Sequence, residues 1–242
     1  MPGSSPGMTI AGLQRMGEIA RLRIEIDEVE PAVVRRVEVP VTIRLDDLHF
    51  VLQIAIGWQN CHPFEFRVGE TAWGLLDRDD PASSPRAAET ATLADVLGLA
   101  GAFRYDYVYG EDWAHTVVLE DVAPADPAVA YPRLVSAQGR CPPADIGGPM
   151  GYETFLRAIA DPEHLHHEGM IEWDDPDFDP HVVDEAAIRA NLANIGKYLG
   201  RRKAEQHLLE HDPEKCAAVF GKDHAQRRSQ IGMTIQAKVI PI

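Results

Sequence analysis

The chain has 242 residues, of which 45% are apolar and 25% are charged, an ordinary composition for a folded protein with a substantial core. Its formal net charge of −15 would repel a phosphate backbone from most of its surface, so nucleic acid is not the expected partner. Apolar runs are only a few residues long, whereas a membrane-spanning helix needs about 20, so we expect no membrane insertion.

Residues 1–18 contain no basic segment followed by an apolar one, so they do not resemble a secretory signal, and we expect a flexible leader. The three cysteines, Cys61, Cys141 and Cys216, form no C-x-x-C pair. An odd number without that spacing argues against a disulfide framework or a zinc ribbon and favours a reducing cytoplasm.

Two strands are predicted first. Leu22, Ile24 and Ile26 alternate with charged residues, the pattern of a half-buried strand. After a turn at Pro31, residues 33–39 form a second strand in which valines share one parity, and Pro40 ends it.

The apolar spacing then changes to steps of three and one, which predicts a helix that ends at Gly57 and packs on the sheet. We expect Thr42 or a neighbour to cap it. Residues 64–76 predict a hairpin and residues 92–100 a short helix capped by Thr92. Alternating aromatic and polar residues in 102–120 predict the clearest hairpin of the chain.

The segment 139–152, GRCPPADIGGPMGY, is too rich in proline and glycine for a helix or a strand, and we interpret it as a stiff connector. Helices are predicted after it, over residues 151–161, 162–173 and 184–200. The expected fold class is therefore α+β: a mixed or antiparallel sheet with one long helix packed on it in the N-terminal half, followed by a helical C-terminal half.

The expected organisation is a leader over residues 1–18, a single α+β domain over 19–200 and a basic extension over 201–242. From Lys197 onward the net charge is +4, against −19 for the rest of the chain. The extension could contact a polyanion or the acidic body of its own chain. Nucleic acid is therefore expected only through this extension, and any other partner would be a protein that the sequence does not identify.

Five scattered residues could form a site, because each lies at a turn or strand end where separate elements can converge. They are His62, Asp112, His115, Cys141 and Asp145. His62, His115, Cys141 and Asp145 are ligand types that zinc or another divalent metal accepts, although no cofactor is certain. The structural alternatives are a packed Cys141, an Asp145 side chain that caps nearby amides, and a His115 bonded to a backbone carbonyl.

Other catalytic patterns fail when tested. Residues 161–185 hold ten Asp or Glu and four His, but contain neither H-E-x-x-H nor a complete calcium loop. The chain has no G-x-S-x-G motif, and IGGPMG is not followed by the G-K-[ST] of a phosphate-binding loop.

The order of motifs over residues 29–68, 103–121, 131–164 and 178–180 resembles the plasmid pRiA4b open-reading-frame-three family, which has the MM3350-like fold and whose members are often labelled TnpR passenger proteins of insertion elements. The resemblance implies an α+β domain with no settled activity. The family's usual H-L-H-x-F stands here as His62-Pro63-Phe64-Glu65-Phe66, and its C-P-P-E-D-x-G-G has Ala144 in place of the glutamate. Two potential metal ligands of the family pattern are therefore absent from this chain.

The label TnpR implies a site-specific recombinase, which needs an activated serine, arginines around the scissile phosphate and a basic DNA-binding helix. The acidic body offers none of these. We therefore expect a cytoplasmic, non-enzymatic accessory or interaction module associated with plasmids or mobile elements. The alternative is a metal-dependent hydrolase or nuclease-like enzyme that uses the five candidate residues.

Overall fold

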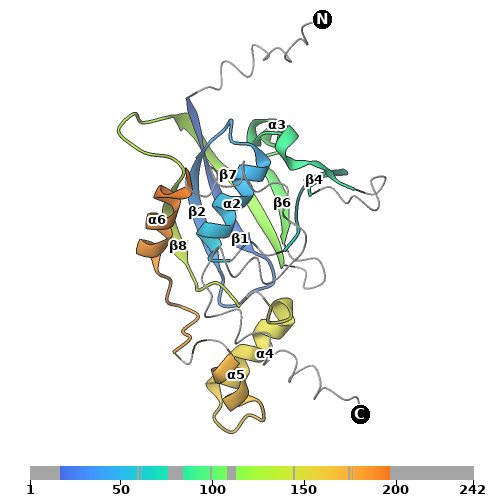
Figure 1. Ribbon diagram of the computed structural model, residues 1–242, viewed down its shortest axis with the longest axis vertical. Coiled ribbons are helices and arrows are strands. Elements are labelled where there is room, and N and C mark those ends of the chain that lie inside the picture. Colours follow the sequence, from blue (N-terminus) through green and yellow to red (C-terminus); the bar gives the residue numbers. More distant parts are fainter. Residues whose placement is uncertain are drawn as a thin grey trace, which may run out of the picture.

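The computed structural model describes residues 17–58, 60, 62–75, 84–98, 100–107, 113–143, 145–173, 175 and 177–196. In these ranges eight strands form one sheet, in the order β5-β4-β3-β6-β7-β1-β2-β8 (Figure 1). Neighbouring strands are antiparallel except β4 and β5, which are parallel. The strands are β1 (Glu18–Ile26), β2 (Val34–Pro40), β3 (Phe64–Val68), β4 (Thr71–Gly74), β5 (Arg86–Ala87), β6 (Ala102–Tyr107), β7 (Trp113–Pro124) and β8 (Arg133–Gln138).

The predicted alternation of β1 is confirmed and sets the register at the centre of the sheet. Leu22 lies opposite Val37 of β2 and Leu119 of β7, and Leu22 is fully buried. The predicted hairpin over 102–120 forms β6 and β7, with Tyr105 opposite His115. Because side chains alternate across a strand, the strands place most of their apolar residues on one face and most of their charged residues on the other, with Arg35 of β2 as an exception.

Helix α2 (Leu45–Ile56) crosses the apolar face of the sheet and buries most of its residues there (Figure 1). It ends where predicted, because Gly57 adopts φ 117° and donates its N–H to the Gln53 carbonyl. Its N-cap is Arg44, a neighbour of Thr42, and the Arg44 side chain makes no capping hydrogen bond. The short turn η1 (Ala88–Thr90) precedes α3 (Leu93–Leu97), where Thr92 and Asp95 form the expected cap.

Three helices follow the connector: α4 (Gly148–Ala160), α5 (His167–Trp173) and α6 (Glu185–Ala193). Helix α6 lies beside β8 and closes that edge of the sheet, since Arg189 donates to the Leu134 and Val135 carbonyls. Glu185 accepts from the Ala137 amide at 3.2 Å. These side chains occupy backbone groups through which an edge strand could otherwise pair with another chain.

The expected fold class is wrong in the amount and length of its helices. The structure is a mostly antiparallel eight-stranded sheet with a few short helices, rather than a sheet carrying one long helix and followed by a helical C-terminal half. The helix on the sheet has only 12 residues, and those after the connector have 13, 7 and 9. Proline, glycine and aspartate interrupt the apolar periodicity of this region, which shortens its helices. The expected extension over 201–242 lies outside the described residues.

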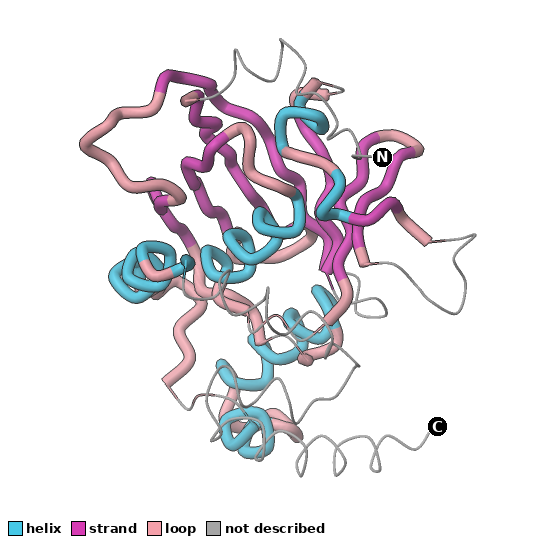
Figure 2. The backbone as a smooth tube through the Cα atoms, turned by 45° about the horizontal axis from the view of Figure 1, so that its top comes forward, coloured by secondary structure: helices cyan, strands magenta, loops and turns pink. Residues whose placement is uncertain are grey.

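The sheet has two unlike faces. The helices gather on one side and at one end of it, and we call the side under α2 the covered face (Figure 2). The other side, the open face, carries charged side chains in the described ranges: Arg21, Arg23, Glu25, Arg36, Glu38, Glu65, Arg67, Arg104, Asp106, Glu120, Asp121 and Arg133. Among the described helices, none combines the length and the apolar character needed to cross a bilayer.

Candidate functional site

Trp58, just after α2, joins the segments that hold the predicted site residues. Its Nε1 donates a hydrogen bond to the Pro142 carbonyl at 3.0 Å, which fixes the connector against the end of α2. Its ring stacks on Tyr107, with centroids 4.9 Å apart, and meets the His115 ring edge-on at 5.1 Å. Connector, helix end and β6–β7 hairpin therefore converge on one indole.

Two of the predicted residues contact each other directly. His62 Nε2 lies 3.1 Å from Asp145 Oδ1, although 83 residues separate them in the chain. The His62 side chain is 26% exposed and that of Asp145 48%, so solvent reaches the pair. The His62 ring also contacts Tyr107 edge-on at 5.7 Å. This is a polar, accessible pair at the rim of the aromatic cluster around Trp58.

His115 lies beneath that rim and is fully buried. Its Nδ1 bonds the Tyr105 carbonyl at 2.9 Å, the backbone bond proposed as the structural alternative, and its Nε2 has no partner. Burial lowers the pKa of His115 from 6.5 to about 4, because the imidazolium would lose its hydration there. The side chain is neutral at pH 7 and lies out of reach of a substrate that approaches from solvent.

Cys141 packs against the end of α2. Its Sγ lies 3.3 Å from the Pro142 carbonyl, to which the thiol donates. A Cβ built on Gly57 would stand 3.3 Å from the Cys141 Cβ, so the connector and the helix end are in tight contact. The thiol is half-buried, on the same side of the sheet as His115.

The structure thus brings His62 and Asp145 together and places His115 and Cys141 in the surrounding packing. Asp112, the fifth predicted residue, lies outside the described residues, as does Cys61. Within the described ranges no three His, Cys, Asp or Glu side chains are grouped so that they could hold a metal ion. The zinc or other divalent metal at His62, His115, Cys141 and Asp145 stays a prediction.

Sequence reasoning missed a buried polar network on the covered face. Tyr105 Oη accepts a hydrogen bond from Gln53 Nε2 at 2.8 Å and bonds His49 Nδ1 at 2.7 Å. The backbone N–H of Asn60 donates to Gln53 Oε1 at 3.0 Å. Burial raises the pKa of Tyr105 well above 10, so the phenol keeps its proton. The available signal was a pair of polar residues one turn apart, His49 and Gln53, within the apolar stripe of a helix.

It also missed Arg35, which is 1% exposed and points into the core from β2. Its guanidinium donates to the carbonyls at the end of α2, Ala55 at 2.6 Å and Ile56 at 3.2 Å. It donates as well to Val34 at 3.0 Å and Gln138 at 2.7 Å. Arg35 therefore ties the last turn of α2 to the β2–β8 edge.

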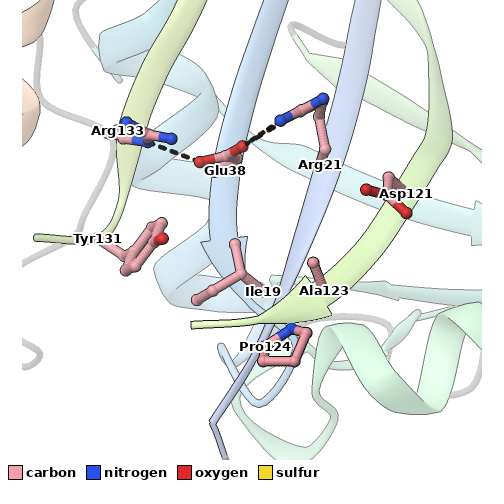
Figure 3. Close-up of a pocket in the computed structure, with 8 residues that line it drawn as sticks. All are labelled: Ile19, Arg21, Glu38, Asp121, Ala123, Pro124, Tyr131 and Arg133. Carbon is pink, nitrogen blue, oxygen red and sulfur yellow. Dashed lines mark hydrogen bonds and ion pairs between the residues drawn. The ribbon is translucent and has the colours of Figure 1, made fainter. Parts of the chain in front are cut away.

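A cavity of about 130 Å³ opens on the other side of the sheet (Figure 3). Arg21 and Arg133 flank Glu38, and each donates to one of its carboxylate oxygens, at 2.7 Å and 2.6 Å. These two bonds lower the Glu38 pKa against the opposing effect of burial, which is the largest single influence on it. Asp121 lies beside Arg21, so the cavity presents both signs of charge.

The model of the plasmid pRiA4b ORF-3-like protein family matches residues 18–187, which include all eight strands and α2 to α5. The chain belongs to the plasmid pRiA4b ORF-3-like family. Within the family it is 42% identical over 161 residues to the uncharacterized protein y4hQ of Sinorhizobium fredii, an alignment that covers 65% of this chain and 81% of that protein.

A solved relative has the same arrangement of elements. The crystal structure of MM3350 from Methanosarcina mazei Go1, a protein of unknown function, superposes with a TM-score of 0.64 at 29% identity. The match covers 70% of this chain and 96% of MM3350. The family assignment is confirmed, and the names of both relatives state no activity.

One departure from the family pattern now has a structural account. Phe64, which stands where the pattern has its second histidine, is 5% exposed and stacks on the His49 ring with centroids 3.7 Å apart. An aromatic ring here completes the core beside the Tyr105 network. At this position a potential metal ligand, histidine, is therefore replaced by an aromatic side chain that packs in the core.

Proposed function

We propose that this member of the pRiA4b ORF-3-like family is a non-enzymatic interaction module and that it binds a protein partner through the open face of its sheet. The observation that carries the proposal is the charge pattern of that face. Six arginines and six carboxylates share it, so it is close to neutral in a chain whose net charge is −15. Such a face repels another acidic protein less than the rest of the acidic body does.

The cavity at Arg21, Glu38 and Arg133 supports the same surface. Arg133 donates to Glu38 through one nitrogen and Arg21 through two. Because a guanidinium has five N–H groups and both side chains are exposed, N–H groups remain that a partner could bond. Asp121 supplies a carboxylate in the same cavity (Figure 3). Guanidinium N–H donors next to a carboxylate acceptor suit a polypeptide surface that carries both signs of charge. A second copy of this chain is the simplest such surface.

Sedimentation velocity over a wide range of concentration, at low and high salt, tests the proposal. We expect reversible association at low salt that weakens as salt rises, because exposed charges are screened. Arg36→Glu should abolish it, and Arg36→Glu with Glu120→Arg, which reverses the pair while keeping it, should restore much of it. Arg157→Glu, at an exposed position of α4, is the matched control.

If the chain stays monomeric under all these conditions, the partner is a different protein. It is then captured from cells with wild-type, Arg36→Glu and Arg157→Glu chains in parallel. A partner held equally by all three would contradict the open-face proposal.

Localisation and context complete the proposal. We place the module in the cytoplasm, where the absence of paired cysteine motifs fits a reducing environment, and associate it with plasmids or other mobile elements through its family. Contact with nucleic acid is proposed only for the extension over 201–242. Deleting those residues should leave open-face association unchanged and remove any salt-sensitive DNA binding.

A second candidate function is a metal-dependent hydrolase or nuclease-like enzyme. The observation in its favour is the contact between His62 and Asp145, an imidazole oriented by a carboxylate at an accessible rim. Elemental analysis of the purified chain, followed by His62→Ala, tests it. Stoichiometric zinc that is lost in the variant would support the enzyme, and a metal-free protein that is equally stable with and without chelator would argue against it.

A further inference from the structure

The cavity of the open face lies along one row of charged side chains that crosses four neighbouring strands. The register sets Asp121 of β7 opposite Arg21 of β1. On the other side, Arg21 lies opposite Glu38 of β2, which in turn lies opposite Arg133 of β8. All four residues line the cavity (Figure 3). Negative and positive charges therefore alternate along the row, with a carboxylate at one end and a guanidinium at the other.

Glu38 holds the two guanidinium groups of this row in place. Its side chain is 8% exposed and accepts a hydrogen bond from Arg21 through Oε1 at 2.7 Å and from Arg133 through Oε2 at 2.6 Å. Arg133 uses only its Nε for this contact, and Arg21 uses its Nε and Nη2. The remaining N–H groups, on side chains that are 41% and 46% exposed, present forked donors of the kind that bind a carboxylate.

Asp121 supplies the opposite charge at the other end of the row. It is exposed and lies beside Arg21 in the cavity (Figure 3). Neighbouring strands are about 4.8 Å apart, so the two charges of one small molecule can reach Asp121 and Arg21 together. A simple anion would be repelled by the carboxylates of the row and a simple cation by its guanidinium groups. A molecule that carries both charges avoids either penalty.

One side of the cavity is apolar. Ile19 of β1 lies opposite Ala123 of β7, two residues along the strands from the charged row, and Pro124 follows. These three side chains line the same cavity (Figure 3). The cavity has a volume of about 130 Å³. Because one water needs about 10–15 Å³ of such space, it has room for a molecule of about ten non-hydrogen atoms.

We propose that this cavity binds a free α-amino acid with an aliphatic side chain, such as leucine. The carboxylate of the amino acid accepts hydrogen bonds from Arg21 and Arg133, and its ammonium group pairs with Asp121. The aliphatic side chain packs on Ile19 and Ala123, where it leaves water. Glu38 is a positioning residue, because it orients both guanidinium groups without contacting the amino acid.

This site goes beyond the proposed association of the open face and can fail separately from it. Arg36 and Glu120, whose reversal tests the association, do not line the cavity. An absence of leucine binding in a chain that still associates through Arg36 would overturn the amino-acid site alone. Leucine binding by a chain that never associates would leave the amino-acid site standing and remove the proposed function.

The test is a titration of the ¹⁵N-labelled full chain with L-leucine, followed by amide NMR shifts. We expect saturable shift changes at millimolar leucine, largest in β1, at the end of β7 and at residues 131–133. Isoamylamine, which lacks the carboxylate, and 4-methylpentanoate, which lacks the ammonium group, should each bind about two- to five-fold more weakly, since each loses one partly exposed ion pair. Inorganic phosphate should not compete with leucine.

Variants show whether the ends of the row bind the two charges. Asp121→Asn should weaken leucine binding by about two- to five-fold and should not weaken the binding of 4-methylpentanoate. Asp106→Asn removes a carboxylate elsewhere on the open face and should change neither. Arg133→Gln should weaken both ligands, whereas Arg36→Gln should weaken neither.

Three results would overturn the proposal. The first is a leucine titration without saturable shifts in the cavity residues. The second is equal binding of leucine by the Asp121→Asn and Asp106→Asn chains, because the ammonium group would then have no partner in the cavity. The third is 4-methylpentanoate or phosphate that binds as tightly as leucine, which would make the cavity a site for simple anions.

Discussion

Arg35 and Arg36 are consecutive residues of β2 with opposite environments. Arg35 faces the core, is 1% exposed and, among the described residues, bonds backbone carbonyls alone. Arg36 faces solvent, with a side chain 40% exposed, and pairs with Glu120 at 2.8 Å. Two identical side chains therefore have different roles: Arg35 holds the end of α2 to the sheet on the covered face, and Arg36 neutralises a surface carboxylate on the open face. Solvent, rather than residue type, decides how much each contributes to stability.

The largest effect should come from Arg35→Met. It leaves the carbonyls of Ala55, Ile56 and Gln138 buried without their donor, which should cost about 3–5 kcal/mol in the free energy of unfolding. Urea denaturation measures this. Arg36→Met is the matched control and should cost less than about 1 kcal/mol. Equal losses at the two positions would erase the distinction between the faces.

His115 should make the covered face sensitive to acid. Its pKa is about 4 when folded and 6.5 otherwise, so the unfolded chain binds more protons between these values. The free energy of unfolding therefore has its full value above pH 6.5, where His115 is neutral in both states. It decreases as the pH falls toward 4, by about 3 kcal/mol in total.

His115→Asn tests this, because its amide can still donate to the Tyr105 carbonyl but cannot titrate. We expect the variant to lose the corresponding slope in a plot of unfolding free energy against pH. His166→Asn, at an exposed position, should keep the wild-type slope. A wild-type chain whose stability is flat between pH 4 and 6.5 would contradict the assigned environment of His115.

The alternation that predicted β2 already contained the position of Arg35. Val33, Val37 and Val39 share a parity that includes residue 35, so the pattern placed a cation on the apolar face. Local periodicity also located β1, the β6–β7 hairpin and the end of α2 at Gly57, because each depends on residues close in sequence. The amount of helix was overestimated, since a weak periodicity broken by aspartate and proline supports only single short helices.

The candidate site could be predicted only in part, for a related reason. Turns and strand ends are places where side chains of separate elements can meet, and His62 and Asp145 are in contact there, while a functional site at these residues stays a prediction. The alternation of Trp113, His115 and Val117 placed His115 on the apolar face of its strand, whereas nothing in the residues around His62 predicted its position at the rim. His115 became buried because Trp58, from another segment, packs against its ring.

Tyr105→Phe should have an intermediate effect. Removal of the hydroxyl leaves Gln53 Nε2 without its acceptor at 2.8 Å in a buried network, and the cost should be about 1–3 kcal/mol. Tyr131→Phe, on the open face, should cost little. Thermal unfolding of both variants makes the comparison, and a Tyr105→Phe protein as stable as Tyr131→Phe would show that the network contributes nothing.

The smallest effect on folding belongs to the open face. A double-mutant cycle on Arg36 and Glu120 should give a coupling of about 0.2–1 kcal/mol, which decreases as salt is added, because both side chains are partly exposed. Weak coupling is what makes this pair useful, since charge reversal can alter association while the unfolding free energy stays constant. A coupling several times larger would mean that the open face stabilises the fold, and lost association in Arg36→Glu could then no longer be separated from lost structure.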